Sequence, residues 1–319
     1  MAKIVVLDGH TTNPGDLSWE KMDALGTLTV YPRTEPAELL PRAHNAEIVL
    51  TNKVVFDKNT FAQLPKLKCI SVMATGYNVI DVKAAQAQGV VVCNVRGYAT
   101  ASVAQHVFAL VLGFYSKIDR HARSVAGGQW QTSPDWSYTL GSTSELAGKT
   151  IGIYGFGQIG QQVAKIALAF GMKVVSNHKH PQRDKRRGVE FVPFEKMLQL
   201  SDVLTLHAPL SAENEGIINA KSLAMMKPGA ILINTGRGGL IVENDLRQAL
   251  ESGTIAGAGL DVLSQEPPEQ GNVLIGAPNC TVTPHNAWAS KEARQRLLDE
   301  SVKNVSAFLK GKPRNEIGK

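Results

Sequence analysis

Residues 150–160 of the chain read TIGIYGFGQIG. The glycines Gly155, Gly157 and Gly160 have the spacing G-x-G-x-x-G, directly after an apolar strand pattern and directly before a helical one. In such a unit the first glycine permits a tight turn, the second lets the backbone approach a pyrophosphate, and the third lets the helix pack closely on the strand. The start of the helix offers free N–H groups to phosphates. The stretch therefore predicts a dinucleotide-binding turn, the alternative being a glycine-rich turn in an ordinary βα unit.

Short apolar runs alternate with helical patterns on both sides of this turn. Before it, the pattern predicts strands at 3–8, 47–50, 68–72 and 90–93, with helices at 36–44, 57–64 and 81–88. From residue 150 it predicts strands at 150–154, 173–176, 202–205, 230–234, 255–260 and 281–283. Strands that alternate with helices form parallel sheets, and 319 residues suffice for two domains. We therefore expect an α/β protein with two parallel sheets.

Two further helices and one irregular segment complete the pattern. Apolar residues recur at helical spacing over residues 100–118, and a charged amphipathic helix is predicted at 289–310. Residues 126–148 show no periodicity and contain Trp130 and Trp136. A loop of this length is usually functional or interfacial.

The composition excludes several classes of protein. A hydrophobic fraction of 43% and a charged fraction of 19% argue against disorder. Three cysteines are too few for a disulfide framework or a zinc site, and neither a signal peptide nor a run of 18 apolar residues is visible. We expect a cytoplasmic protein with no membrane partner. The net charge of +6 leaves an anionic ligand open.

The basic excess is concentrated after the second strand of the glycine unit. Many such units carry an acid there, about 20 residues after the glycines, that binds the ribose 2′-hydroxyl of NAD. This chain has Asn177 or His178 instead, and residues 178–188 hold five Lys or Arg against one acid. Lys179 and Arg183 stand where a 2′-phosphate would lie. We expect NADP in preference to NAD, the alternative being a solvated charged turn. Nucleic acid is not expected, since the chain shows no reading helix, zinc module or aromatic-studded sheet.

Three further segments lie at the predicted carboxyl ends of strands, where ligands bind in open α/β sheets. They are residues 234–238 (NTGRG), 261–267 (DVLSQEP) and 283–288 (TPHNAW). Together with the glycine stretch, the loop 74–78 and the helix 100–118, they strongly resemble the D-isomer-specific 2-hydroxyacid dehydrogenase family. The resemblance covers nearly the whole chain.

The resemblance implies three catalytic residues, Arg237, Glu266 and His285. Arg237 would bind the substrate carboxylate and polarise the keto oxygen, while His285, paired with Glu266, would donate a proton in reduction. Reduction of a 2-keto acid leaves charge on an oxygen that needs a proton, which is a role suited to histidine. A neighbouring carboxylate favours the imidazolium, and a guanidinium matches a carboxylate bidentately. No metal is required. Alternatively, each side chain could serve only local structure.

The resemblance also implies the remaining ligand contacts. Asp261 would meet the nicotinamide end of the cofactor, and backbone N–H groups near Thr75 and Gly76 would hold the substrate carboxylate. The expected cofactor-binding residues are Gly155, Gly157, Gln158, Ile159, Gly160, Asn177, His178, Lys179, Arg183, His207, Pro209, Thr235, Gly236, Arg237, Asp261, His285 and Ala287. The expected substrate-binding residues are Asn52, Lys53, Thr75, Gly76, Arg237, His285 and Trp288.

Residues 94–106 and 284–289 are similar to the glycerate dehydrogenase, or hydroxypyruvate reductase, branch of the family. We therefore expect NAD(P)-dependent reduction of hydroxypyruvate or glyoxylate to the D-2-hydroxy acid. A D-lactate or phosphoglycerate-type dehydrogenase and a corepressor-like dinucleotide sensor are the alternatives. The chain ends soon after the helix 289–310, which disfavours the phosphoglycerate dehydrogenases with an appended domain. The family's formate dehydrogenases carry Gln where this chain has Glu266.

The domain organisation follows from the resemblance. It implies two Rossmann-like or flavodoxin-like domains, with a cofactor domain of residues 99–287 inserted into a discontinuous substrate domain of residues 1–98 and 288–319. The reaction would take place in the cleft between them, and closure would exclude water. Because the family is usually dimeric through the helix 100–118 and the loop 126–148, a homodimer is expected.

Overall fold

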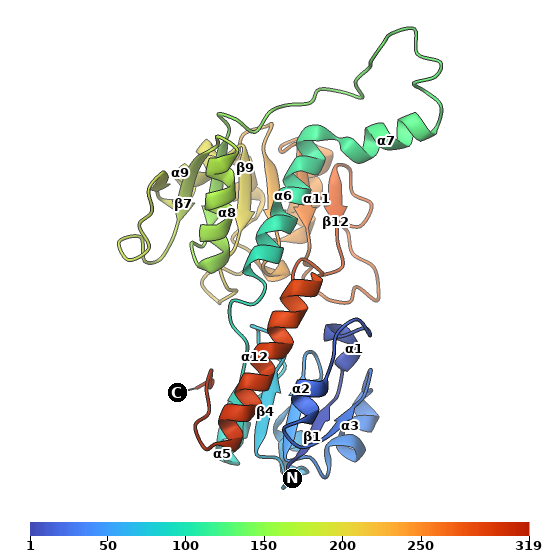
Figure 1. Cartoon of the computed structure of the whole chain (residues 1–319). Coiled ribbons are helices and arrows are strands. Elements are labelled where there is room, and N and C mark those ends of the chain that lie inside the picture. Colours follow the sequence, from blue (N-terminus) through green and yellow to red (C-terminus); the bar gives the residue numbers. More distant parts are fainter. Residues whose placement is uncertain (319) are drawn as a thin grey trace. The chain divides into compact units, whose positions relative to one another are not determined.

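The structure, a computed structural model, describes residues 1–318 as two compact units (Figure 1). The first consists of Met1–Ala99 together with the chain from Ala289 onward, and the second consists of Thr100–Trp288. Each unit contains one sheet with only parallel strand pairs, of five strands in the first unit and seven in the second. The predicted α/β class with two parallel sheets is confirmed.

The first unit is built on a sheet in the order β2-β1-β3-β4-β5. Its strands are β1 (Lys3–Val6), β2 (Thr27–Val30), β3 (Ile48–Thr51), β4 (Cys69–Val72) and β5 (Val91–Cys93). Its helices are α1 (Gly9–Thr12), α2 (Glu20–Asp23), α3 (Pro36–Ala43), α4 (Lys58–Ala62), α5 (Val82–Ala87) and α12 (Lys291–Leu309). Every residue of β3 and β4 is buried, as expected for the centre of a parallel sheet that is covered on both faces.

The sheet of the second unit has the order β12-β11-β10-β9-β6-β7-β8. Its strands are β6 (Thr150–Tyr154), β7 (Lys173–Asn177), β8 (Val189–Phe191), β9 (Val203–Leu206), β10 (Ile231–Asn234), β11 (Gly257–Leu260) and β12 (Cys280–Val282). The helices are α6 (Thr100–Ser116), α7 (Ile118–Ala126), α8 (Gln158–Ala169), α9 (Phe194–Leu200), α10 (Ala220–Ala224), the short 3-10 helix η1 (Gly238–Leu240) and α11 (Glu243–Glu251). The chain runs from β6 to β8 on one side and returns to β9 on the other. Ligands of open parallel sheets bind at the carboxyl edge beside such a reversal.

Several elements differ from the sequence prediction, among them one helix and two edge strands. The helix expected over 100–118 ends at Ser116, because Lys117 adopts a left-handed conformation with a φ of 52° and α7 starts after it. The edge strand β2 exposes three of its four residues and therefore has no apolar run to reveal it. The other unpredicted edge strand, β8, has only three residues, none of them buried.

No single helix within residues 1–318 is long and apolar enough to span a membrane. The helices α6 and α7 reach that length only as a pair, across a bend of 58°. Six residues of α6 are buried, and five of them belong to a hydrophobic cluster of its own unit.

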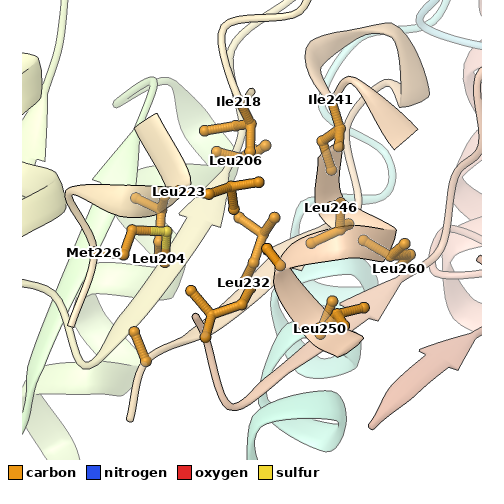
Figure 2. Close-up of a cluster of buried hydrophobic side chains, with 14 of the residues drawn as sticks. Leu204, Leu206, Ile218, Leu223, Met226, Leu232, Ile241, Leu246, Leu250 and Leu260 are labelled. Atoms are coloured by element: carbon orange, nitrogen blue, oxygen red, sulfur yellow. The ribbon is translucent and has the colours of Figure 1, made fainter. Parts of the chain in front are cut away.

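The main core of the second unit lies among β9, β10, β11 and α11 (Figure 2). Leu232 of β10 is completely buried there, with Leu204 of β9 and Leu246 and Leu250 of α11 in the same cluster. Such close packing leaves little room for the surroundings to collapse if a side chain is shortened. This core fixes α11 and the ends of the neighbouring strands.

We expect Leu232→Ala to lower the stability of the second unit by about 3 kcal/mol, because it removes buried methyl groups and leaves a cavity. Leu210→Ala, at a side chain that is 43% exposed, serves as the control and should cost less than about 1 kcal/mol. Calorimetric unfolding of both variants measures the difference. Equal losses would contradict the assignment of Leu232 to the centre of the core.

Candidate active site

The turn between β6 and α8 requires two of its three glycines, Gly155 and Gly160. Gly155 has a φ of 91°, and a Cβ atom there would lie 2.5 Å from the backbone nitrogen of Ala208. A Cβ at Gly160 would lie 2.4 Å from the carbonyl oxygen of Gly155, so the helix packs on the turn without room for a side chain. At Gly157 the same position faces open space. No side chain caps the first turn of α8, which leaves the amides of residues 158–160 for an anion. This cradle fits the pyrophosphate of a dinucleotide.

The segment after β9 lies against this turn. The N–H of His207 donates to the carbonyl of Tyr154 at 2.7 Å, and its Nε2 lies 2.9 Å from Thr205 Oγ1. Burial lowers the pKa of His207 to about 3, so its ring is neutral at physiological pH. His207 is therefore unsuited to donate a proton as an imidazolium. The next predicted cofactor residue, Pro209, accepts a hydrogen bond from Asn214 Nδ2 through its carbonyl.

A histidine–aspartate pair holds the chain after β7. His178 Nδ1 accepts from the N–H of Phe156 at 3.1 Å, and its Nε2 lies 2.7 Å from Asp184 Oδ2. Because Nδ1 accepts, Nε2 carries the hydrogen and donates it to the carboxylate. Arg183 donates to the same oxygen through Nε and Nη2, at 3.0 and 2.6 Å. These hydrogen bonds, from Arg183 first and from His178 second, lower the pKa of Asp184 to about 2.

The pair with Asp184 changes which basic groups are available beside β7. Two of the three nitrogens of Arg183 are bound to Asp184, and Arg186 donates to Gln161 Oε1 at 2.9 Å. The Lys179 side chain is 77% exposed, and its Nζ lies 3.7 Å from Glu213 Oε2 in a loose surface ion pair. Of the two cations predicted to meet a 2′-phosphate, Lys179 is therefore the more available. The amide of Asn177 donates to the carbonyl of Val192.

The loop after β10 is shaped by a buried asparagine. Asn234 is completely buried; its Oδ1 accepts from the N–H of Gly236 at 3.0 Å and its Nδ2 donates to the carbonyl of Arg237 at 2.8 Å. The exposed Arg237 donates through Nη1 to the carbonyl of Gly236. Thr235 Oγ1 is buried without a hydrogen-bond partner, an unsatisfied group that a bound ligand could complete. The loop thus presents the guanidinium at the carboxyl edge of the sheet.

The chain after β11 and β12 brings Glu266 and His285 together. Glu266 Oε2 lies 2.5 Å from His285 Nδ1, and Glu266 Oε1 accepts from the N–H of Leu263 at 2.9 Å. A carboxylate can only accept, so Nδ1 of His285 carries the hydrogen and its Nε2 is left to face a ligand. The Glu266 and His285 side chains are 30% and 28% exposed. The pair is therefore ordered and still accessible.

The backbone of His285 is held in an unfavourable conformation. Its φ of 50° lies in the left-handed region, which costs a residue other than glycine roughly 1–2 kcal/mol. The N–H of His285 donates to the carbonyl of Thr283 at 3.0 Å, and its own carbonyl accepts from Trp288 Nε1 at 2.8 Å. The Trp288 indole therefore supports the histidine. Strained residues of this kind concentrate at active sites.

Asp261, only 1% exposed, lies beneath the same turn. Its carboxylate accepts from the N–H groups of Asn286 and Ala287, at 3.0 and 2.8 Å, and from Thr283 Oγ1 at 2.6 Å. His106 Nε2 lies 3.0 Å from Thr283 Oγ1. Since the Thr283 hydroxyl gives its hydrogen to Asp261, His106 Nε2 carries a hydrogen and donates it to Thr283. In this structure Asp261 anchors the residues that directly follow His285.

In the first unit, a buried carboxylate organises the end of β3. Asp8 accepts from the backbone N–H groups of Asn52 at 2.9 Å and of Lys53 at 2.6 Å. Burial raises the pKa of Asp8, although these hydrogen bonds oppose the shift. The Asn52 side chain donates to the carbonyl of Met73, and its Oδ1 is buried without a partner. No sequence motif singles out Asp8.

The ends of β4 and β5 are linked in a similar way. Thr75 Oγ1 donates to the carbonyl of Val95 at 2.8 Å, and Asn94 Nδ2 donates to the carbonyl of Thr75 at 2.7 Å. The backbone around Thr75 and Gly76 is thereby fixed, and neither residue is fully buried. The predicted substrate residues of this unit thus all follow the carboxyl ends of its central strands.

The structure joins some of the predicted residues by direct hydrogen bonds, while others share a sheet edge without such a bond between them. Direct hydrogen bonds join Glu266 to His285, His285 to Trp288, and Asp261 to Ala287. The other predicted residues of the second unit lie at the same edge of its sheet. Sequence patterns missed the supporting residues, although an Asn two residues before a Gly is a recognisable turn signal at Asn234. Among residues 1–318 no three His, Cys, Asp or Glu side chains are grouped to hold a metal ion.

The chain is similar over most of its length to several known reductases and dehydrogenases. The chain is 46% identical to the hydroxypyruvate reductase of Blautia hydrogenotrophica over 99% of its own length and all of that protein's. It is 47% identical to the glycerate dehydrogenase of Methylorubrum extorquens over 88% of each chain. A solved structure of an acyclic imino acid reductase in complex with NADPH and D-Arg matches with a TM-score of 0.87 at 34% identity, covering 99% of both chains.

The family model for the D-isomer specific 2-hydroxyacid dehydrogenase NAD-binding domain matches residues 108–287. These residues include the glycine turn, the arginine loop and the Glu266–His285 pair. The resemblance noted in the sequence is therefore confirmed, and the chain belongs to the D-isomer specific 2-hydroxyacid dehydrogenase family.

Proposed function

We propose that this protein is an NAD(P)-dependent D-2-hydroxyacid dehydrogenase that reduces hydroxypyruvate or glyoxylate, with His285 as the proton donor. The observation that carries the proposal is the Glu266–His285 pair, held at the same sheet edge as a glycine cradle that fits a dinucleotide. The names of the similar enzymes, hydroxypyruvate reductase and glycerate dehydrogenase, support the substrate class. A glyoxylate reductase of Thermococcus litoralis, 41% identical over 85% of this chain, supports it further.

Reduction of the keto group requires a hydride at carbon and a proton at oxygen. When bound, a nicotinamide cofactor would supply the hydride. His285 would supply the proton from Nε2 while its Nδ1–H remains hydrogen-bonded to Glu266. Solvent then reprotonates Nε2 and restores the positive charge of the ring. The adjacent carboxylate stabilises that charge. His207 is unsuited to this role because burial keeps it neutral. Arg237 binds the substrate carboxylate and draws electron density from the keto oxygen.

The first unit supplies further substrate contacts in this proposal. The backbone N–H groups near Thr75 and Gly76 hold the substrate carboxylate, and Asn52 and Lys53 contact the rest of the molecule. Residues 1–98 and 288–319 then act as the substrate domain and residues 99–287 as the cofactor domain. The hydrogen bonds from Asp8 to the Asn52–Lys53 backbone support this assignment, since they preorganise that loop.

For the cofactor we propose NADP in preference to NAD. The residue at the end of β7 is Asn177 rather than an acid, so no carboxylate there repels a 2′-phosphate. Lys179 is exposed beside it, while Arg183 has one nitrogen left beyond its pair with Asp184. The NADPH complex of the 34% identical imino acid reductase is consistent with this preference.

We further propose a cytoplasmic homodimer that binds neither nucleic acid nor membrane. Ile118 of α7 is 68% exposed, and Trp130 and Trp136 in the following segment are 52% and 92% exposed. Figure 1 shows α7 and this segment extending away from the sheet of their own unit. Large apolar side chains that are exposed together are typical of association surfaces.

His285→Ala should lower kcat for hydroxypyruvate by on the order of 10²–10⁴-fold, because the developing alkoxide loses its proton donor. The dissociation constant for NADPH should change less than about twofold. Steady-state kinetics and fluorescence titration measure the two quantities, with exposed His44→Ala as the control. Near-normal turnover by the His285→Ala variant would show that His285 is not the proton donor.

Arg237→Lys should reduce kcat/KM for the keto acid about 10–100-fold, since an ammonium group cannot reproduce the two parallel hydrogen bonds of a guanidinium. The matched control is Arg123→Lys, at a surface ion pair on α7. Initial-rate measurements at varied keto acid give the ratio. If both variants behaved alike, Arg237 would not bind the substrate.

The unmodified protein should use NADPH more efficiently than NADH, and Lys179→Gln should erode that preference about tenfold by weakening the contact with the 2′-phosphate. The control is Lys196→Gln on α9, outside residues 178–188. A matrix of keto acids against both cofactors measures kcat/KM for each pair. Equal efficiency with both cofactors would refute the NADP proposal. Tight dinucleotide binding without turnover of any keto acid would instead favour a dinucleotide sensor.

A further inference from the structure

Glu266 lies on a long connection without regular structure. Residues 261–279 join β11 to β12 and contain no helix or strand, and residues 264–267 are exposed. A proton-donating pair needs its atoms placed within a fraction of an ångström, which an unsupported loop does not provide. Other groups must therefore hold this connection in place.

The start of the connection is fixed by close backbone packing. A Cβ at Gly238 would lie only 1.9 Å from the carbonyl carbon of Leu263, so only glycine allows the two segments to approach this closely. The Leu263 N–H also orients the Glu266 carboxylate through Oε1. This packing fixes the chain before Glu266 and leaves residues 264–272 to be held by something else.

One side chain, Glu243 at the start of α11, bridges both ends of the 264–272 loop. Its Oε1 accepts from the N–H of Ser264 at 2.7 Å, and its Oε2 accepts from Ser264 Oγ at 2.7 Å and from Asn272 Nδ2 at 2.8 Å. One turn further along α11, Arg247 Nη1 donates to the carbonyl of Val273 at 2.8 Å. A single helix thus holds the loop before and after Glu266.

We propose that Glu243 is a positioning residue for the proton-donating pair, since its carboxylate closes the 264–272 loop and so holds Glu266 against His285. The inference rests on the proposed function, because it assigns Glu243 a role in the same reaction. Glu243 acts through Glu266 and does not itself touch the substrate. Removing it takes away the contacts that hold the loop at Ser264 and at Asn272.

The chain offers a matched control on the same helix. Asp245 also lies in the first turn of α11, and its Oδ2 accepts a backbone N–H, that of Ala220, at 2.8 Å. Removing either acid costs the helix a favourable charge at its N-terminus. Only Glu243 is connected to the Glu266 loop.

The experiment compares Glu243→Ala, Glu243→Gln and Asp245→Ala in the full chain. We expect Glu243→Ala to lower kcat for hydroxypyruvate about 10–100-fold with KM changed less than threefold, because the reacting groups are misplaced. Glu243→Gln, which keeps the acceptor for the Ser264 N–H, should recover part of the loss.

Cleavage after Glu269 by a glutamate-specific protease should accelerate in Glu243→Ala. Asp245→Ala should leave both kcat and this cleavage near the unmodified values.

A double-mutant cycle tests whether Glu243 works through Glu266. In a Glu266→Gln background, Glu243→Ala should lower kcat by less than about twofold further. The inference is overturned if the full loss recurs in that background, if Asp245→Ala lowers kcat as much as Glu243→Ala, or if faster cleavage leaves kcat unchanged. Failure of the unmodified protein to reduce any 2-keto acid would instead overturn the proposed function, and this inference with it.

Discussion

The hydrogen bond between Glu266 and His285 is the interaction that the rest of the candidate active site supports. It selects the tautomer of the imidazole, and it stabilises the ring when it becomes charged. Both residues lie outside regular structure, and the left-handed backbone of His285 is unfavourable by itself. The pair therefore exists only because its surroundings hold it, with Trp288 and Asp261 beneath His285 and Leu263 beside Glu266.

Parallel sheets explain why residues so far apart in the chain can cooperate. Each strand delivers its carboxyl end to the same edge, so the glycine turn, the arginine loop and the histidine turn gather there. Close backbone approach at Gly155 and Gly238 locks neighbouring loops together. In the first unit, Asp8 holds the end of β3 in a different way, by accepting hydrogen bonds from the backbone N–H groups of the two residues that follow it.

Much of the fold could be predicted from the sequence, because buried strands and glycine turns carry strong local signals. The exposed strand β2 and the left-handed Lys117 carry none. For the candidate site, motifs pointed to the residues that we propose carry the chemistry, but not to the residues that support them. Glu243 precedes Ser264 by 21 residues, and only the folded chain brings them together. Nor does the basic run after β7 indicate that its single acid, Asp184, forms an ion pair with Arg183.

The central claim is that Glu266 and His285 act as one unit in proton donation, and single-turnover kinetics tests it most directly. The rate of NADPH oxidation on mixing with excess hydroxypyruvate would be followed for Glu266→Gln, His285→Ala and the double variant. Groups that act as a unit lose their effect together, so the double variant should be about as slow as His285→Ala alone. Independent losses that multiply in the double variant would contradict the account.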